Sequence, residues 1–315
     1  MRALMSAGPA LKRDNTAGFN CFAGEVEFIT DKGFVNFKNS VGSTVNILNK
    51  DGIFTPAKVV DFGSQKLNKV TLRHSKKSNM KTEISATADH TWHTKRGIVT
   101  DLKVGDIIPS RTVRTEHTLN IEAWIEGFGF GDGTYDSRGR ARVRLCGDKN
   151  KFISIFESYG NSSIMNPPSQ DGDALVVFHT GYFTRWKSLP ESHLNDLNYL
   201  SSWLQGYLDA DGCKNVISSQ DNTAISFVCK IAPLCGYIVT GLNTSNNLET
   251  NYGKRKAPLI RLTLQRETSF IVESIIESDV APIYCVVEPI THTFTLSNGA
   301  VTGNCTYLPI DDIKA

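Results

Sequence analysis

Two kinds of sequence pattern divide this chain, and the division limits the folds that it can adopt. Short β-type runs separated by turn residues fill residues 21–118 and return over 280–304, which is typical of an all-β sandwich or barrel-like fold. Helical and strand patterns alternate over residues 119–279, which indicates an α+β domain. We therefore expect a β domain interrupted by an α+β domain, with residues 1–20 and 305–315 as flanks.

The composition is that of an ordinary globular protein, with 40% apolar and 21% charged residues in a chain of 315, and this length allows two separate cores. Seven unevenly spaced cysteines form no paired framework and no signal peptide is recognised, so we expect reduced thiols in the cytoplasm. No apolar run approaches the roughly 18 residues that a bilayer requires, so no membrane partner is expected. Residues 119–279 carry a formal charge of −3, so a surface for nucleic acid there requires local grouping of basic residues.

Two Asn-Cys peptide bonds, Asn20-Cys21 and Asn304-Cys305, carry the groups that can move an acyl group along a backbone. A thiolate at Cys21 can attack the preceding carbonyl and convert the amide to a thioester, and Cys305 can then take the acyl group. Asn304 can cyclise onto its own carbonyl and release residues 21–304. The junctions therefore predict a precursor that cuts out its own middle and joins its flanks.

Thr87 and His90 fit a helper role at the first junction. They lie three residues apart at the end of a β-type run, so a hydroxyl and an imidazole can face one scissile bond and serve its leaving amine. Alone, such a pair is more often a polar turn with a satisfied histidine. Together with Cys21 and the Asn304-Cys305 junction, it is expected to be functional.

The order of these motifs resembles an intein. The resemblance covers residues 21–304 and rests on a β run that starts at Cys21, Thr87-x-x-His90, Thr94-Lys95-Arg96-Gly97, Val104-Gly105-Asp106, Tyr284 through Phe294, and Asn304-Cys305. It implies the horseshoe-shaped β fold, called Hint, that inteins share with hedgehog autoprocessing domains. The resemblance implies that splicing needs no cofactor. It also implies that Cys21 is the first nucleophile and that Thr87 and His90 activate the upstream junction. At the downstream junction, His292 would assist, Asn304 would cyclise, and Cys305 would accept the acyl group.

Two positions depart from the usual intein pattern. Gly303 stands where a histidine usually precedes the cyclising asparagine, which removes a proton donor that His292 is expected to replace. Cys285 stands where aspartate is common, and with Trp92 and Thr302 it completes the triplet of class 3 inteins, whose internal cysteine attacks the upstream bond. Cys285 is therefore a candidate nucleophile, and the alternative is a cysteine that only fills a buried β position. Which of the two thiols attacks first stays open.

The middle section contains two similar nine-residue segments, Ile125–Gly133 and Leu204–Gly212. Each has small residues four apart, which let two helices approach backbone to backbone, and each ends in aspartate followed by glycine. Crossing of such helices would bring Asp132 and Asp211 together, and paired carboxylates recruit a hard cation such as Mg²⁺ for phosphodiester hydrolysis. Glycine-rich helices that serve packing alone are the weaker alternative, because the motif occurs twice with a matched acid.

Both segments resemble LAGLIDADG motifs; the second is a near match, and the first is looser but keeps its acid. The resemblance covers roughly residues 119–279 and implies a monomeric homing endonuclease of two αββαββα halves. Its partner would be double-stranded DNA of the intein-free host allele. Asp132 and Asp211 would then bind Mg²⁺ and be catalytic, whereas Asp209 is not the usual ligand.

Basic residues that follow each motif are candidates for DNA contacts. Alternating arginines in the first half are predicted to share one face of a strand, from which they can read the major groove or bind phosphates; they are Arg138, Arg140, Arg142 and Arg144. The candidates in the second half are Lys254, Arg255, Lys256 and Arg261. The alternative for each of them is a solvated surface charge.

The flanks resemble an adenosylcobalamin-dependent ribonucleotide reductase, in which the cysteine at the Cys305 position belongs to the active-site redox pair. The resemblance rests on residues 2–11 and on the joined segment Asn20-Cys305-Thr306-Tyr307-Leu308-Pro309-Ile310-Asp311. The 31 flanking residues cannot fold into a reductase, so we expect a truncated piece, a gene fragment or half of a split host, without reductase activity.

Three functions are compatible with these motifs. The leading one is autocatalytic splicing combined with a site-specific DNA endonuclease. The second is a free-standing DNA-binding or DNA-cleaving protein whose β domain no longer splices. The third is an autoprocessing domain that cleaves its junctions without ligating the flanks.

Overall fold

The computed structural model describes residues 20–74, 80–114, 118–165, 173–179, 183, 186–213, 215–250 and 253–305. The chain divides into two compact units: the first takes residues up to Arg114, Gly236–Gly241 and from Gln265 onward, and the second takes Thr115–Cys235 and Leu242–Leu264. An interrupted β unit was expected, but it resumes at residue 265 rather than 280. The reason is that one long strand, Ser269–Val287, runs through the predicted boundary without a break. In the described part of the chain, no helix is both long and apolar enough to cross a membrane.

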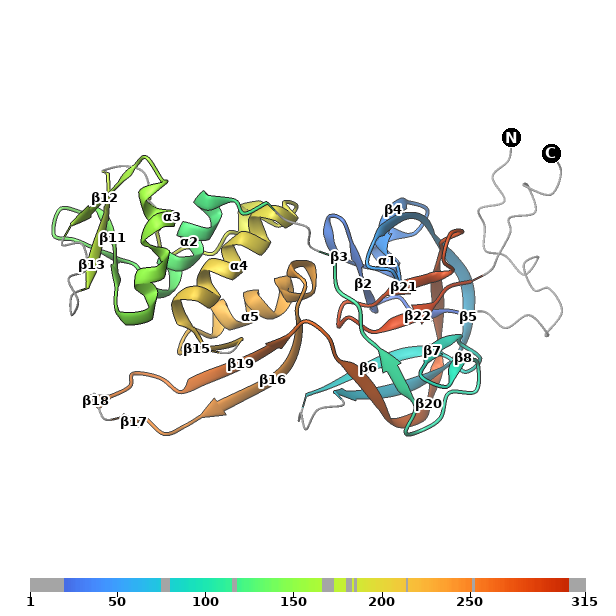
Figure 1. Cartoon of the computed structure of the whole chain (residues 1–315). Coiled ribbons are helices and arrows are strands. Elements are labelled where there is room, and N and C mark those ends of the chain that lie inside the picture. The colour runs from blue at the N-terminus through green and yellow to red at the C-terminus, as the bar shows by residue number, and fades with distance from the viewer. Residues whose placement is uncertain are drawn as a thin grey trace. The chain divides into compact units, whose positions relative to one another are not determined.

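The first unit consists mainly of antiparallel strands (Figure 1). Its elements are β1 (Phe22–Ala23), β2 (Glu27–Thr30), β3 (Gly33–Asn36), α1 (Phe37–Ser40), β4 (Thr44–Leu48), β5 (Phe54–His74), β6 (Lys81–Thr87), β7 (Trp92–Thr94), β8 (Gly97–Val99), β9 (Ile107–Pro109), β20 (Ser269–Val287), β21 (Thr293–Thr295) and β22 (Val301–Gly303). One sheet has the order β3-β2-β4-β5-β6-β1-β20-β9, and another has the order β21-β22-β7-β8. β1 therefore lies between β6 and β20, which places the residue before it, Cys21, next to both strands.

Strand β5 runs without a break from Phe54 to His74. It pairs with β20 from His74 to Lys58, and β20 keeps this pairing through three register shifts. Gly63 has a φ of +84°, a conformation that glycine adopts without a Cβ penalty, so the chain bends there without ending the strand. The long strands β5 and β20 form a curved frame, and β1, which follows the first junction, pairs with β20.

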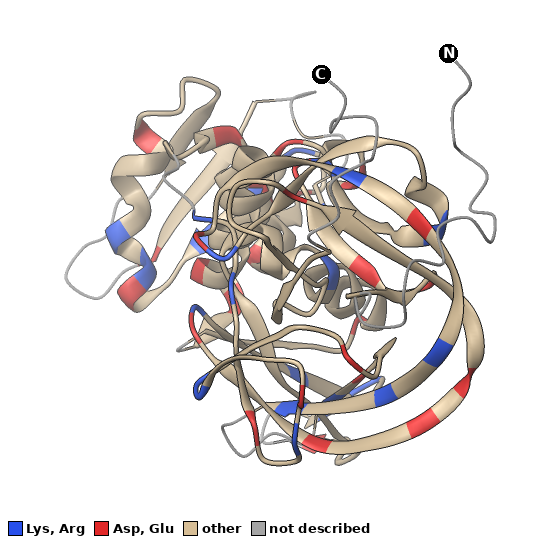
Figure 2. Cartoon of the chain, turned by 90° about the vertical axis from the view of Figure 1, so that its right-hand side faces the viewer, with Lys and Arg blue, Asp and Glu red and all other residues tan. Residues whose placement is uncertain are grey.

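Charged residues of both signs occur along these long strands (Figure 2). Ion pairs join neighbouring strands at Lys66–Glu277 (2.5 Å) and Lys69–Glu83 (3.4 Å), and Lys81 of β6 reaches across β5 to Glu273 of β20 (2.7 Å). Exposed pairs of this kind are worth below about 1 kcal/mol each. They help to set strand register, while the stability of the unit comes from the apolar core.

The core of the first unit is an aromatic cluster close to the first junction. Phe22 lies in stacked contact with Phe37 at 5.6 Å and in edge contact with Phe294 at 5.7 Å between ring centroids. Its ring also contacts the imidazole of His90 at 4.2 Å. Burial of each phenylalanine contributes about 1.5–3 kcal/mol, and the same packing fixes the residue that follows Cys21 in the chain.

The second unit repeats one arrangement of helices and strands. Its first half contains α2 (Ile121–Asp132), β10 (Thr134–Tyr135), β11 (Ala141–Leu145), α3 (Ile153–Glu157), β12 (Ser162–Met165) and β13 (Ala174–Phe178). Its second half contains α4 (Leu197–Asp211), β14 (Gly212–Cys213), β15 (Val216–Ser219), α5 (Asn222–Ile231), β16 (Ile238–Ser245), the hairpin β17 (Glu249–Thr250) and β18 (Gly253–Lys254), and β19 (Leu259–Gln265). The two sheets, β10-β11-β13-β12 and β14-β15-β19-β16, have the same order when the strands of each half are counted from its first and the separate β17–β18 hairpin is left out.

Each half of the second unit contains the order αββαββ, but the final helix of the expected αββαββα repeat is missing from the described residues of both halves. In the first half a short 3-10 turn, Glu191–His193, precedes α4. In the second half β19 leads into β20 of the first unit without an intervening helix among the described residues. The interruption of the β unit therefore ends on a strand, which explains why a boundary at residue 279 was wrong.

Candidate active sites

Three cysteine thiols meet in the buried interior of the first unit. The Sγ atoms of Cys21 and Cys305 are 3.8 Å apart, and the backbone N–H of Cys305 donates a hydrogen bond of 3.3 Å to Sγ of Cys285. All three residues are at most 4% exposed. They come from three distant segments, the start of β1, the strand β20 and the end of β22. The structure thus brings together both predicted junction thiols and the third candidate nucleophile.

The three thiols differ in acidity. Burial raises the pKa of Cys21 and of Cys285 well above its ordinary value. Hydrogen bonds from these two thiols instead lower the pKa of Cys305 to about 5. A negative charge in the cluster is therefore held most readily on Cys305, and Cys21 needs a base before it can attack.

Thr87 and His90 flank the upstream peptide bond. The N–H of Cys21 donates to Oγ1 of Thr87 at 3.3 Å, and the Thr87 N–H donates to the Cys21 carbonyl at 3.0 Å. His90 is fully buried, and burial lowers its pKa to about 3, with the Asn20 backbone opposing this shift in part. Its imidazole is therefore neutral at ordinary pH, and the Thr87 hydroxyl lies directly at the nitrogen that would leave.

Trp92 and Thr302 fix the position of this imidazole. They face each other across the β7–β22 pair. Oγ1 of Thr302 lies 2.5 Å from Nε2 of His90, and the Trp92 ring contacts the His90 ring at 4.8 Å. These two members of the predicted triplet therefore contact the histidine, while the third, Cys285, contacts Cys305.

Hydrogen bonds hold Asn304 at the downstream junction on two sides. Its Nδ2 donates to the carbonyl of Glu288 at 2.7 Å, and its backbone N–H donates to the carbonyl of His292 at 3.1 Å. The Glu288 carboxylate accepts from the N–H groups of Ile290 and Thr291, which closes the turn that presents these carbonyls. His292 has a φ of +54° and an exposed side chain, so its described contact with Asn304 is through the backbone. The catalytic role predicted for its imidazole stays a prediction.

One residue at the site was missed by the sequence analysis. The side chain of Asn20 accepts hydrogen bonds from the N–H and hydroxyl of Thr91 and donates to the carbonyl oxygen of Asn304 at 2.9 Å. It therefore touches both junctions, one through its own carbonyl and the other through its amide. No sequence pattern marks it, because the residue belongs to the flank and its partners lie 71 and 284 positions away.

The helices α2 and α4 of the second unit cross with their backbones in contact. A Cβ at Gly127 would lie 1.9 Å from the Trp203 carbonyl oxygen, and one at Gly206 would lie 2.0 Å from the Trp124 carbonyl oxygen. The contacts are reciprocal, as expected for duplicated helices related by a pseudo-twofold axis. The small residues that the sequence repeats at four-residue spacing are therefore required by the crossing itself.

The acids at the ends of these helices lie at the crossing. A Cβ at Gly131 would lie 3.1 Å from Oδ2 of Asp211, so this carboxylate lies against the end of α2, where Asp132 is the last residue. Burial and the charge of Asp132 raise the pKa of Asp211. Lys149 forms an ion pair with Asp132, and Nζ of Lys187 donates to the carbonyls of Phe130 and Gly131 at 2.6 and 2.7 Å.

These two lysines were missed by the sequence analysis, since neither lies in a repeated motif. Burial lowers the pKa of Lys187, and the charges of Asp211 and Asp132 oppose this shift. Both ammonium groups lie beside the carboxylates and offer positive charge to an anion at the crossing. Asp209 has a different surrounding: its carboxylate accepts from the indole N–H of Trp124 at 2.9 Å and from Gln205 at 3.2 Å, which is a packing role.

The paired carboxylates fit a hard divalent cation. Burial and the charge of Asp132 both raise the pKa of Asp211, a cation between the two acids would relieve their repulsion, and carboxylate oxygen is the ligand that Mg²⁺ prefers. Asp132 and Asp211 are therefore the residues that would hold it. No cluster of three or more acidic, histidine or cysteine side chains suited to a metal occurs among the residues that the structure describes.

The predicted arginine face in the first half is only partly correct. Arg142 and Arg144 lie in β11 opposite the buried positions of that strand. Arg138 instead lies in the preceding turn, and Arg140 precedes the strand and pairs with Asp136 at 2.7 Å. The Asp136 carboxylate also accepts from the N–H groups of both residues, so an aspartate-centred turn ends the alternation.

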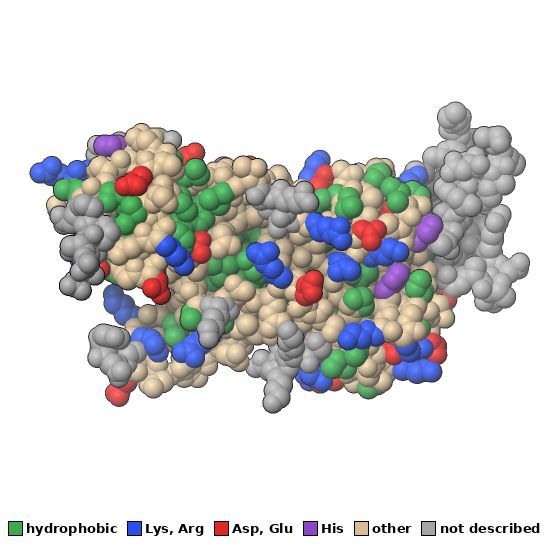
Figure 3. Space-filling model, in the orientation of Figure 1, with side chains coloured by type: hydrophobic (Ala, Val, Ile, Leu, Met, Phe, Trp, Pro, Cys, Tyr) green, Lys and Arg blue, Asp and Glu red, His purple; other side chains and the backbone are tan. Residues whose placement is uncertain are grey.

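In the second half, basic side chains lie on and beside the β17–β19 strands. Lys254, Lys256 and Arg261 are exposed, and Lys and Arg side chains gather at this end of the second unit (Figure 3, lower left). Arg255 differs, because its guanidinium donates to the Asn247 carbonyl at 3.2 Å and stabilises the loop. The exposed set remains available for a phosphate backbone.

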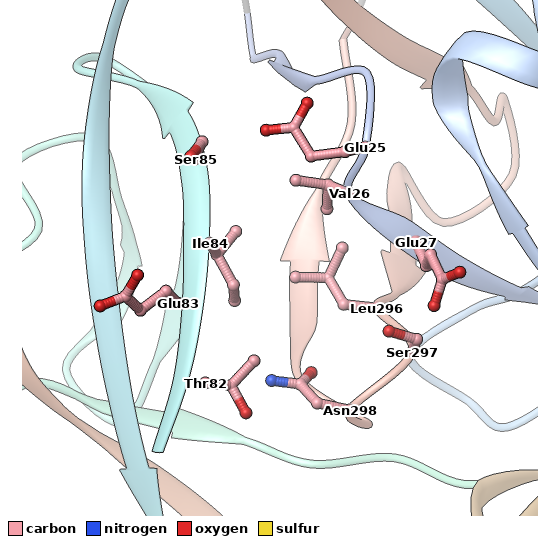
Figure 4. Close-up of a pocket in the computed structure, with 10 residues that line it drawn as sticks. All are labelled: Glu25, Val26, Glu27, Thr82, Glu83, Ile84, Ser85, Leu296, Ser297 and Asn298. Carbon is pink, nitrogen blue, oxygen red and sulfur yellow. The ribbon is translucent and has the colours of Figure 1, made fainter. Parts of the chain in front are cut away.

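The first unit also has a pocket of about 200 Å³, which is lined by residues other than those of the two junctions. Figure 4 shows Val26, Ile84 and Leu296 pointing toward one another across it, and the carboxylates at its border are Glu25, Glu27 and Glu83. It contains no thiol, histidine or asparagine of the two junctions. This pocket is therefore separate from the buried thiol cluster.

No protein-family model matches the chain. A curated relative is the ribonucleoside-diphosphate reductase large subunit of Invertebrate iridescent virus 6, which is 25% identical over 252 residues, covering 70% of this chain and 24% of that protein. The chain thus spans about a quarter of this relative.

Similar solved structures are a Ssp DnaB mini-intein variant (10% identity, TM-score 0.35, covering 90% of this chain and 98% of the other) and the homing endonuclease I-DmoI (14% identity, TM-score 0.32, covering 45% and 88%). Likeness at this level does not by itself establish a function. The curated relative is the large subunit of a ribonucleotide reductase, the enzyme that the flanking residues resemble.

Proposed function

We propose that the chain excises residues 21–304 by autocatalytic protein splicing and that the excised segment is also a site-specific double-strand DNA endonuclease. The observation that carries the splicing proposal is the buried meeting of both junctions, with the Cys21 and Cys305 sulfurs 3.8 Å apart. The cysteines of the two junctions lie 284 residues apart in the chain, and their contact places the acyl donor beside the acyl acceptor. The match to a viral reductase adds support. It covers 70% of this chain, which is far more than the 31 flanking residues, so the match must include part of residues 21–304.

The reaction follows from the groups present. Sγ of Cys21 attacks the Asn20 carbonyl, the bond to the Cys21 nitrogen breaks, and that nitrogen takes a proton as the thioester forms. Thr87 accepts from this N–H and so orients the leaving nitrogen. Sγ of Cys305 then displaces Cys21 from the acyl group, over the short distance between the sulfurs.

Release of the interior segment requires the downstream bond to break. Nδ2 of Asn304 attacks the carbonyl carbon of the same residue, the bond to the Cys305 nitrogen breaks, and this nitrogen takes the proton lost by Nδ2. The excised segment then ends in a succinimide. The freed Cys305 amine attacks the thioester, and the flanks are joined by an ordinary peptide bond.

Cys285 is a second candidate for the first attack. Its burial beside Cys305, together with the contacts of Trp92 and Thr302 with His90, supports the class 3 route. The same contacts support a second role, in which the Cys285 sulfur orients the N–H of Cys305. Substitution of each thiol separately distinguishes the two.

The endonuclease proposal rests on the crossed helices with their terminal acids. Asp132 and Asp211 would hold Mg²⁺, which lowers the pKa of bound water and supplies the nucleophile for phosphodiester hydrolysis. Lys149 and Lys187 place positive charge beside these acids and would contact the phosphate. Arg142, Arg144 and the exposed basic residues of the second half would bind the DNA backbone.

Mass spectrometry of the expressed chain tests the proposal. We expect a ligated peptide of the two flanks, 31 residues long, and an excised product of 284 residues. Intact precursor after prolonged incubation would contradict splicing and favour a free-standing endonuclease. Separate flanks without a ligated peptide would indicate cleavage alone.

A further inference from the structure

We propose that Asn20, a residue of the upstream flank, is the hydrogen-bond donor that stabilises the oxyanion when Asn304 cyclises. The assignment rests on the splicing function proposed above and adds a catalytic residue to it. Asn20 contacts a reacting atom directly, since its Nδ2 donates to the carbonyl oxygen of Asn304 at 2.9 Å. This is the oxygen on which negative charge develops when the carbonyl carbon is attacked.

Thr91, the other hydrogen-bond partner of the Asn20 side chain, determines the orientation of its amide. Its Oδ1 accepts two hydrogen bonds from Thr91, 2.8 Å from the N–H and 2.7 Å from the hydroxyl. An amide nitrogen cannot accept from two donors, so the end that faces Asn304 is the N–H₂ group. Thr91 therefore holds the donor in place before the reaction, which is the condition for effective transition-state stabilisation.

The other reacting group is held in the same way. Nδ2 of Asn304, the nucleophile, donates to the Glu288 carbonyl at 2.7 Å, and the Asn304 N–H donates to the His292 carbonyl at 3.1 Å. In the cyclisation, Nδ2 forms the bond to the carbonyl carbon, and the electron pair of the carbonyl moves onto the oxygen that Asn20 contacts. The pair then returns as the bond to the Cys305 nitrogen breaks, and this nitrogen takes the proton from Nδ2.

Gly303 makes this arrangement possible. Its N–H donates to the Thr91 carbonyl at 3.0 Å, and a Cβ at this position would lie 2.9 Å from the same oxygen and 3.0 Å from the Thr91 side chain. A larger residue would therefore displace Thr91, which holds Asn20. The missing histidine before Asn304 and the asparagine before Cys21 are thus two parts of one arrangement.

The Asn20 donor also links the acyl transfer to the cyclisation that follows it. Asn20 moves with the acyl group from Cys21 to Cys305, and the two sulfurs are only 3.8 Å apart, so its side chain stays within reach of the Asn304 carbonyl. Hydrolysis of the thioester would remove Asn20 together with the upstream flank. The downstream bond would then break slowly, which favours ligation over loss of both flanks.

The test isolates the downstream step by substituting both upstream thiols, Cys21→Ala with Cys285→Ala, and follows release of the segment that begins at Cys305 by mass spectrometry. In this background we expect Asn20→Ala to slow release by about 10²-fold, the usual effect of removing one oxyanion donor. Thr91→Val, which removes one of the two bonds that hold Asn20, should slow it by a smaller factor. Release at an unchanged rate in the Asn20→Ala chain would overturn the assignment.

A second measurement separates this outcome from failure of the splicing proposal. In chains with both thiols intact and Asn304→Ala, which blocks cyclisation, hydroxylamine should cleave the upstream thioester whether residue 20 is Asn or Ala. Loss of this cleavage along with downstream release would show that Asn20 only holds the fold, and would overturn the assignment. Absence of hydroxylamine cleavage in the chain that carries only Asn304→Ala would contradict splicing itself.

Gly303→His provides an independent check. If a histidine before Asn304 simply restored a missing proton donor, downstream release would be faster. We expect it to be slower, because the side chain displaces Thr91 and with it the Asn20 amide. Faster release in the Gly303→His chain would overturn the proposed arrangement.

Discussion

The two candidate centres of this molecule differ in how they treat solvent. In the thiol cluster, Cys21, Cys285 and His90 have no exposed surface and Asn304 is 2% exposed, and backbone groups make many of the contacts. At the helix crossing, the side chains of Asp132 and Lys149 are 24% and 31% exposed. A centre whose substrate is its own chain can be closed completely, whereas a centre that acts on an external polymer must stay open to it.

The difference extends to charge. The buried centre keeps its groups neutral, as the low pKa of His90 and the raised pKa of Cys21 both require, with Cys305 as the one group that ionises readily. The open centre instead collects opposite charges, two carboxylates and two lysines. The first arrangement suits acyl transfer between thiols, and the second suits binding of a metal and a phosphate.

The largest effect is expected from the thiols of the buried centre. We expect Cys21→Ala to abolish ligation, which mass spectrometry of the flanks would detect, because the acyl group then has no upstream carrier. Cys285→Ala should leave ligation intact if this cysteine only orients Cys305. If instead Cys285→Ala abolishes ligation and Cys21→Ala does not, the class 3 route is correct. Either substitution should leave DNA cleavage unchanged, and a loss of cleavage would contradict the independence of the two centres.

The next largest effect is expected at the open centre, where α4 offers a matched pair of acids. Asp211→Asn should lower the rate of DNA cleavage with Mg²⁺ by about 10³-fold, because the cation loses one of its two carboxylates and several kcal/mol of transition-state stabilisation. Asp209→Asn should retain most activity, since an amide oxygen can still accept from the indole of Trp124. Equal losses for both substitutions would mean that the helix end, rather than the metal, determines activity.

The two centres were predicted from the sequence on different grounds. Repeated motifs with glycines four apart define helix crossings through local spacing, and Gly127 and Gly206 lie in that crossing as expected. The thiol cluster required chemical reasoning about Asn-Cys junctions, because its members are far apart in the chain. Asn20 could not be found in this way, since its amide contacts Thr91 and Asn304 only after the sheet has formed.

The errors have local physical causes. The alternating arginines lie partly in β11 and partly in the turn before it, because an alternating sequence pattern does not show where a strand begins. Gly139, with a φ of +74°, and the Asp136 carboxylate were the signals that could have marked this turn. The boundary at residue 279 failed for the opposite reason, as β20 continues through a polar stretch that pairs with β5.

The third prediction concerns the packing on which the open centre depends. Gly127→Ala places a Cβ 1.9 Å from the Trp203 carbonyl, and we expect it to lower the free energy of unfolding of the second unit by about 3 kcal/mol. Gly160→Ala is the matched control, because nothing lies within 4 Å of its Cβ, and it should change the stability by less than about 0.5 kcal/mol. Urea denaturation measures both. Equal effects would show that the helices do not cross at Gly127.

The smallest effect is a pH dependence that belongs to the buried centre. Burial lowers the pKa of His90 from 6.5 to about 3, so between these values the unfolded chain binds a proton that the folded chain does not. The free energy of unfolding should therefore fall as pH decreases from about 6.5, by up to about 1.4 kcal/mol per pH unit from this residue. His90→Gln should remove that part of the slope while His74, whose pKa is lowered to about 4, contributes equally to both chains.

Denaturation in an Asn304→Ala background, which blocks cyclisation, would measure the two slopes at pH 7, 5.5 and 4.5. Parallel curves would mean that His90 is not held neutral, and the contrast between a closed neutral centre and an open charged one would then lose its main support.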